Sequence, residues 1–86
     1  MNVTFSEIAL DEYFAWQTED RKTLKRINAL IRSIQREGLT VGIGKPEPLK
    51  YRKGYSRRID DANRLEYDSD GKQGIIILRC KGHYED

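Results

Sequence analysis

The sequence of 86 residues contains one cysteine, one histidine and one tryptophan. A single cysteine excludes an internal disulfide bond, and with one histidine beside it the chain cannot complete a Cys/His zinc site. No apolar run reaches the roughly 18 residues of a membrane-spanning helix, and no signal-peptide pattern opens the chain. These absences predict a cytoplasmic protein that uses no metal and no other cofactor.

The net charge is only +2, but the charges are segregated along the sequence. Residues 1–20 contain acidic side chains and no Lys or Arg, whereas residues 21–36 contain six Lys and Arg and no acid. A second basic cluster covers residues 45–58. Local basic surfaces attract polyanions such as RNA even when the total charge is near neutral, and they equally attract an acidic protein partner.

Capping residues and hydrophobic periodicity predict two helices in the first half of the chain. Ser6 and Asp20 are good N-cap residues, and Gly38 suits the position after a helix C-terminus. They delimit helices over about 7–17 and from 21 to the residue before Gly38, the second with an apolar stripe at helical spacing and a basic opposite side. The short link between them predicts a helical hairpin.

Short strands are predicted on both sides of this hairpin. One precedes it at 2–5, and three or four follow it, at 56–59, 63–68 and 74–80, with 49–52 as the optional fourth. The order predicts an α+β fold, β-α-α-β-β-β(-β), in which a twisted, mostly antiparallel sheet carries the hairpin on one face. The chain is expected to form a single domain over residues 1–86.

Strand alternation predicts which side chains face the helices and which face away. In the middle strands Ile59, Leu65 and Tyr67 are expected inside, and Arg58, Arg64 and Glu66 on the open face. In the last strand the expected core residues are Ile76, Leu78 and Cys80. The outward residues there would be Ile75, Ile77 and Arg79.

The open face could assemble the groups that cleave RNA without a metal. Transesterification needs a base for the 2′-hydroxyl, cations for the phosphorane and an acid for the leaving 5′-oxygen. Glu47 between two prolines, the outward arginines and His83 after the last strand could supply these roles. Each is weak evidence alone, because a loop Glu, a terminal His and an outward strand Arg are more often solvated surface residues. Tyr51 and Tyr55 lie beside cations and could stack on bases, although Tyr51 could equally pack in the sheet.

Four ordered motifs resemble a known family. GKPEPLK at 44–50, SRRI at 56–59, NRLEY at 63–67 and the terminal HY at 83–84 are similar to the YoeB/Txe toxins of bacterial type II toxin–antitoxin pairs, within the RelE/ParE superfamily. The resemblance implies a microbial-RNase-like, RelE-like fold. It also implies a ribosome-dependent mRNA endonuclease, or mRNA interferase, that cleaves the message in the ribosomal A site by 2′-hydroxyl transesterification and inhibits translation. The implied partners are mRNA, the ribosome with its RNA, and a YefM-type antitoxin that neutralises the toxin; operator DNA is bound only through the antitoxin, and a homodimer is possible.

The resemblance also implies roles for individual residues. Glu47 would be the general base, Arg64 would steady the transition state, His83 would be the general acid, and Tyr84 would position the scissile nucleotide. The expected RNA-binding residues are Lys45, Lys50, Tyr55, Arg57 and Arg58. The expected ribosome-binding residues are Lys22, Lys25, Arg32 and Arg36.

Two other functions stay open at this point. One is a ParE-like toxin that inhibits DNA gyrase without cutting RNA, because a shared fold does not determine function. The other is a weakened nuclease that serves mainly as an antitoxin-binding co-repressor, since Glu85 and Asp86 add negative charge beside His83. The sequence does not specify a codon preference.

Overall fold

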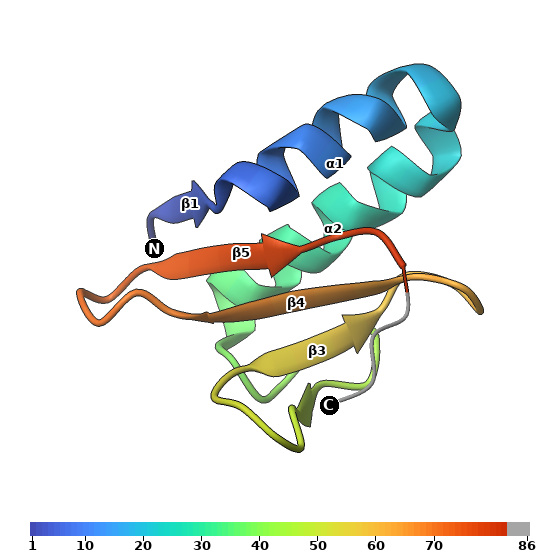
Figure 1. The fold of residues 1–86 in the computed structure, drawn as a ribbon. Helices are drawn as coiled ribbons and strands as arrows, with labels where there is room; N and C mark the ends of the chain where they lie inside the picture. The colour runs from blue at the N-terminus through green and yellow to red at the C-terminus, as the bar shows by residue number, and fades with distance from the viewer. Residues whose placement is uncertain (83–86) are drawn as a thin grey trace.

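The computed structural model describes residues 1–82 and contains two helices and five strands in this part of the chain (Figure 1). Their order is β1 (Val3–Phe5), α1 (Glu7–Glu19), α2 (Arg21–Glu37), β2 (Glu47–Pro48), β3 (Tyr55–Arg58), β4 (Arg64–Ser69) and β5 (Ile75–Arg79). The sheet order is β1-β5-β4-β3-β2, with β1 parallel to β5 and the other pairs antiparallel. The helical hairpin covers one face of the sheet, which confirms the predicted α+β fold.

Both helices begin after the predicted N-cap residues, Ser6 and Asp20. The Ser6 hydroxyl accepts the Ala9 N–H at 3.0 Å, and the Asp20 carboxylate accepts the N–H groups of Lys22 and Thr23. The hydrogen bond from the Thr23 hydroxyl, and after it these two backbone bonds, lower the pKa of Asp20 because they favour its charged form. Helix α1 extends to Glu19, two residues beyond the predicted end, because Asp20 both ends α1 and caps α2.

The hydrophobic core lies between the hairpin and the sheet. Helix α2 contributes Ile27, Leu30 and Ile34, all fully buried, and β4 contributes Leu65 and Tyr67. The sequence predicted both sets, because periodicity in the helix and alternation in the strand marked the same faces. Removing such side chains from water supplies most of the favourable free energy of folding.

The optional strand at 49–52 is not a strand in the structure. The paired segment is Glu47–Pro48, which lies antiparallel to β3 with Glu47 opposite Ser56. Residues 49–54 form the loop that reverses the chain, closed by the bond from the Leu49 N–H to the Gly54 carbonyl at 2.9 Å. Strand pairing with β3 therefore ends at Pro48, where the chain turns. The alternating residues that follow Pro48 belong to the loop.

The predicted alternation of β5 is wrong by one residue. Ile75 and Ile77 are fully buried, whereas Ile76 and Leu78 are partly exposed. In a continuous apolar run the sequence does not indicate which alternate side chains face the helices, so pairing with β4 decides which of them enter the core. A register shift opposite Glu66 and Tyr67 then changes which residues of the chain face inward. Cys80, which follows this shift, is therefore buried as predicted.

Candidate active site

The open face of the sheet carries a row of polar residues from four adjacent strands. The register places Glu47 opposite Ser56, Ser56 opposite Glu66, and Glu66 opposite Arg79. Directly opposed residues of antiparallel strands have Cβ atoms about 4.5–5.5 Å apart and on the same face. Side chains from separate strands therefore converge on one surface.

Arg64 joins this row from β4. Its Nη1 lies 3.4 Å from Ser56 Oγ and 4.0 Å from Glu47 Oε2. Its side chain is 25% exposed, whereas that of Glu47 is 61% exposed. The structure thus brings together a solvent-accessible carboxylate and a partly buried guanidinium, two of the groups that the sequence nominated for proton transfer and charge neutralisation.

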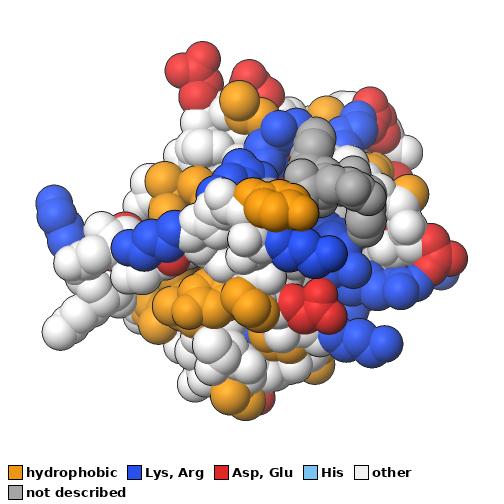
Figure 2. Space-filling model, turned by 60° about the horizontal axis from the view of Figure 1, so that its bottom comes forward, with side chains coloured by type: hydrophobic (Ala, Val, Ile, Leu, Met, Phe, Trp, Pro, Cys, Tyr) orange, Lys and Arg blue, Asp and Glu red, His pale blue; other side chains and the backbone are white. Residues whose placement is uncertain are grey.

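Three of the predicted RNA-binding cations lie at the surface near this pair. Arg58 is exposed and forms an ion pair with Asp61, while Lys45 and Lys50 are exposed in the segments that flank β2. The Arg58 N–H donates to the Gly44 carbonyl at 2.7 Å, which holds the segment leading to Glu47 against β3. Figure 2 shows Lys and Arg side chains gathered on this side of the molecule, with acidic side chains among them. Such a surface attracts a polyanion.

Two predicted RNA contacts lie on the other face of the sheet, and the structure corrects the one that is fully buried, Arg57. Tyr55 is half-buried and stacks on Tyr67, with ring centroids 5.9 Å apart. Arg57 is fully buried. Both residues alternate with Ser56 and Arg58, so they point toward the helices.

The buried Arg57 guanidinium organises the segment between α2 and β2. It donates to the carbonyls of Gly38 at 2.9 Å, Val41 at 2.6 Å and Ile43 at 3.1 Å. It also donates to the hydroxyls of Ser33 and Tyr67, each at 2.9 Å. This buried cation therefore shapes the chain that delivers Glu47 and does not reach the surface.

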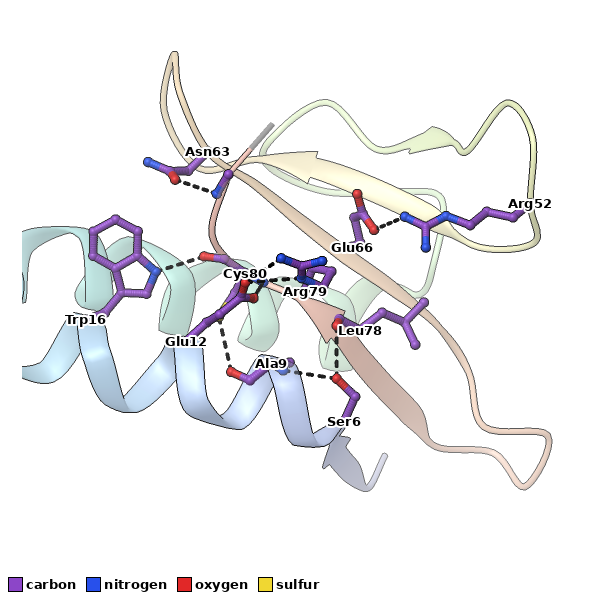
Figure 3. A network of polar contacts seen from close by, with 11 residues as sticks. Ser6, Ala9, Glu12, Trp16, Arg52, Asn63, Glu66, Leu78, Arg79 and Cys80 are labelled. Carbon is purple, nitrogen blue, oxygen red and sulfur yellow. Dashed lines mark hydrogen bonds and ion pairs between the residues drawn. The ribbon is translucent and has the colours of Figure 1, made fainter. Parts of the chain in front are cut away.

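Arg79, predicted to point outward, is bound to helix α1. Its Nε and Nη2 donate to Glu12 Oε2 at 3.1 and 2.9 Å, and Glu12 Oε1 accepts the Cys80 N–H at 2.8 Å (Figure 3). Trp16 of α1 donates to the Cys80 carbonyl at 2.8 Å. Helix α1 thus binds the chain at and after the end of β5. No local pattern in the sequence predicted this contact.

The last described residue, Gly82, is held beside Arg64. Its N–H donates to Asn63 Oδ1 at 2.7 Å, and its carbonyl accepts the Arg64 N–H at 2.9 Å. His83 and Tyr84, the predicted acid and positioning residue, lie outside the described residues. Asn63 is a residue of the site that sequence reasoning missed, although its place next to Arg64 was a usable signal.

Glu66 and Arg52 form a second pair on the open face. Glu66 is only 1% exposed and is paired with Arg52, whose side chain is 49% exposed. Alternation placed Glu66 on this face, but nothing in the sequence indicated a partner from the loop before β3. Glu66 lies directly opposite Ser56, whose hydroxyl contacts Arg64, so the pair lies close to Arg64.

Metal-binding clusters, membrane spans and the free thiol give no alternative site among the described residues. Within residues 1–82 no group of three or more His, Cys, Asp and Glu could hold a metal ion, and neither helix has the length and hydrophobicity of a membrane span. Burial raises the pKa of the Cys80 thiol to about 12, so it is a poor nucleophile. The predicted ribosome-binding residues are all exposed on α2: Lys22, Lys25, Arg32 and Arg36.

Known proteins are similar to this chain in sequence and in fold. The profile of a family described as the YoeB-like toxin of the bacterial type II toxin–antitoxin system matches residues 5–84. The chain belongs to the YoeB toxin family. It is 44% identical to Toxin YoeB of Synechocystis sp. over 99% of both chains.

Solved YoeB structures have the same architecture. The toxin in the heterotetrameric YoeB–YefM toxin–antitoxin complex of Staphylococcus aureus is 46% identical, with a TM-score of 0.88 over 98% of each chain. The YoeB dimer of the same organism is 46% identical, with a TM-score of 0.89 and the same coverage. The microbial toxin fold is therefore shared over nearly the whole length.

Proposed function

We propose that this member of the YoeB family is a ribosome-dependent mRNA endonuclease that cleaves the message in the ribosomal A site and stops translation. The observation that carries the proposal is the convergence of Glu47 and Arg64, 4.0 Å apart on an open face rich in cations. Gly82, held by hydrogen bonds to Asn63 and Arg64, supports a contribution from the residues that follow it.

The proposed chemistry is a transesterification at one phosphodiester. Glu47 takes the proton of the 2′-hydroxyl, and the 2′-oxygen forms a bond to phosphorus. Arg64 neutralises the charge that develops on the non-bridging oxygens. The bond from phosphorus to the 5′-oxygen then breaks, and His83 protonates the leaving oxygen while Tyr84 positions the nucleotide. The products carry a 2′,3′-cyclic phosphate and a 5′-hydroxyl.

The ribosome would supply the orientation that the free protein lacks. Glu47 is 61% exposed and only loosely placed near Arg64, so a flexible RNA in solution would seldom align with both groups. The exposed cations of α2 would bind ribosomal RNA through its phosphates: Lys22, Lys25, Arg32 and Arg36. Lys45, Lys50 and Arg58 would contact the message.

The proposed partners follow those of the Staphylococcus aureus relative, which is solved as a complex with YefM and as a dimer. A cognate YefM-type antitoxin would neutralise this protein in the cytoplasm by covering its basic open face. Operator DNA would be contacted only through the antitoxin. A homodimer is the corresponding proposal for the free toxin.

The decisive experiment maps cleavage of a message on programmed ribosomes by the purified protein. Glu47→Gln, Arg64→Ala and His83→Ala should each reduce the cleavage rate by about 10²–10⁴-fold while retaining the wild-type circular dichroism spectrum. Glu7→Gln, which changes an exposed carboxylate of α1, is the matched control and should cleave normally.

Three results would refute the proposal. Cleavage at the wild-type rate by all three active-site variants would remove the assigned roles. Inhibition of gyrase supercoiling with the message left intact would indicate a ParE-like toxin instead. Operon repression with the antitoxin but without any cleavage would indicate a co-repressor.

A further inference from the structure

The loop of residues 49–54, which joins β2 to β3, carries an exposed aromatic ring and an exposed guanidinium, two groups capable of contacting RNA. They belong to Tyr51 and Arg52. Tyr51 is 84% exposed, so it does not pack in the sheet. Cations that follow a backbone and aromatic rings that stack on bases are the two elements of single-strand recognition.

Both ends of this loop are anchored. The Leu49 N–H donates to the Gly54 carbonyl at 2.9 Å. Gly54 has a φ of 126°, and a Cβ atom there would lie 2.9 Å from the Tyr67 carbonyl oxygen. Because only glycine suits that conformation at such close approach, this end of the loop packs directly against β4.

The ion pair between Arg52 and Glu66 anchors the loop at a third point. Glu66 is almost fully buried, and a buried carboxylate is costly unless it is paired. The pair draws the Arg52 side chain over the open face of the sheet (Figure 3). Its guanidinium is thereby placed by the tertiary structure and has lost much of the freedom of a surface arginine.

Arg52 and Arg64 bind opposed residues of the same face. Arg52 binds Glu66, and Arg64 Nη1 lies 3.4 Å from the hydroxyl of Ser56, the residue directly opposite Glu66. Opposed residues have Cβ atoms about 5 Å apart, so the side chains that hold the two guanidinium groups are neighbours. A guanidinium has five N–H donors and can bridge a carboxylate and a phosphate.

We infer that loop 49–54 is a second RNA-binding element, in which Arg52, oriented by Glu66, binds the phosphate next to the scissile one and Tyr51 stacks on a base. The inference rests on the proposed function for the location of the scissile phosphate at Glu47 and Arg64. A solely structural pair would neutralise Glu66 without changing RNA affinity, and this difference can be measured.

The test is binding of a fluorescent 2′-O-methyl RNA oligonucleotide, which this chemistry cannot cleave, followed by anisotropy over a range of salt concentrations. Arg52→Ala should weaken binding about 10-fold and lower the salt dependence of log Kd by about 0.7, the value for one phosphate on a single strand. Lys53→Ala removes the same charge from the same loop and should change Kd less than about 2-fold. Tyr51→Ala should weaken binding about 5-fold or more, whereas Tyr51→Phe, which keeps the ring, should bind normally.

Glu66 is tested through Arg52. Glu66→Gln should reproduce the loss caused by Arg52→Ala, and the double variant should bind no more weakly than Arg52→Ala alone. If Glu66→Gln does not fold, the comparison of Arg52→Ala with Lys53→Ala decides the question. Equal effects of those two variants, no effect of Arg52→Ala, or additive losses with Glu66→Gln would overturn the inference.

A parallel cleavage assay on programmed ribosomes separates this inference from the proposed function. If the wild-type protein binds the oligonucleotide through Arg52 but leaves the message intact, the proposed function fails and the role of the loop stands. If the wild-type protein cleaves the message and Arg52→Ala binds and cleaves as well as Lys53→Ala, only the role of the loop fails.

Discussion

Replacement of the buried Arg57 should destabilise the fold and not merely weaken RNA binding. Within residues 1–82 this guanidinium forms no ion pair, and its charge is balanced by hydrogen bonds to neutral oxygens. In Arg57→Ala three loop carbonyls, those of Gly38, Val41 and Ile43, lose this donor. A buried polar group left unpaired costs about 1–3 kcal/mol.

The lower end of that range applies, because water can reach part of this surface segment. The three carbonyls together then give a loss of about 3 kcal/mol in the free energy of unfolding. A small domain has about 5–15 kcal/mol in total, so the variant should fold but only marginally. Arg57→Lys keeps the charge but not the planar fork of donors, and should lose less stability than Arg57→Ala.

Urea unfolding followed by the fluorescence of Trp16, the only tryptophan, measures the effect. With a slope of about 1 kcal/mol/M for a small domain, the midpoint of Arg57→Ala should fall by about 3 M. Lys53→Ala, an exposed cation of loop 49–54, should shift it by less than about 0.5 M. A stability of Arg57→Ala within about 1 kcal/mol of wild type, combined with weaker RNA binding, would refute the structural role.

Three further predictions follow from caps and burial. Asp20→Ala should lower the Tm at neutral pH by removing the cap of α2. Because the pKa of Asp20 is lowered in the folded protein, its contribution to stability is present above about pH 4 and is lost as the pH falls through the folded-state value. A difference in Tm between wild type and variant that is as large at about pH 2 as at neutral pH would contradict this. Iodoacetamide at about pH 8.5 should alkylate Cys80 far more slowly in the native than in the urea-unfolded protein. Since the pKa of the Cys80 thiol is raised to about 12 in the folded protein, the free energy of unfolding should decline as the pH rises from about 8.5 toward that value. Cys80→Ala should remove this decline. Asn63→Ala should speed hydrogen exchange of the Gly82 amide, measured by NMR, and lower the cleavage rate on ribosomes; exchange at the wild-type rate would show that the bond from Gly82 to Asn63 contributes nothing.

The part of the candidate site on β4 could be predicted from the alternation of apolar and polar residues in that strand. Arg64 and Glu66 alternate with the apolar Leu65 and Tyr67, so their direction could be derived from the sequence alone. Arg57 follows the same alternation and points inward between Ser56 and Arg58, although its charge favoured a place on the surface. Its burial depends on carbonyls of residues 38–43, which only the folded chain brings to it.

The sequence by itself determined the elements whose signals are local. Ser6 and Asp20 cap the helices through neighbouring N–H groups, and the apolar spacing of α2 marks its buried face within a few turns. Family membership could also be inferred at this level, since the ordered motifs around Glu47 and Arg64 are properties of the chain alone.

Only the tertiary structure decided the contacts between distant segments. The phase of β5, the pair between Glu12 and Arg79, and the pair between Arg52 and Glu66 depend on strand register and on loops that close far from their partners in the sequence. Local propensities act over a few residues, whereas register and burial are set by the packing of the whole sheet against the helices. The residues that orient the candidate site therefore became visible only when the fold had placed them side by side.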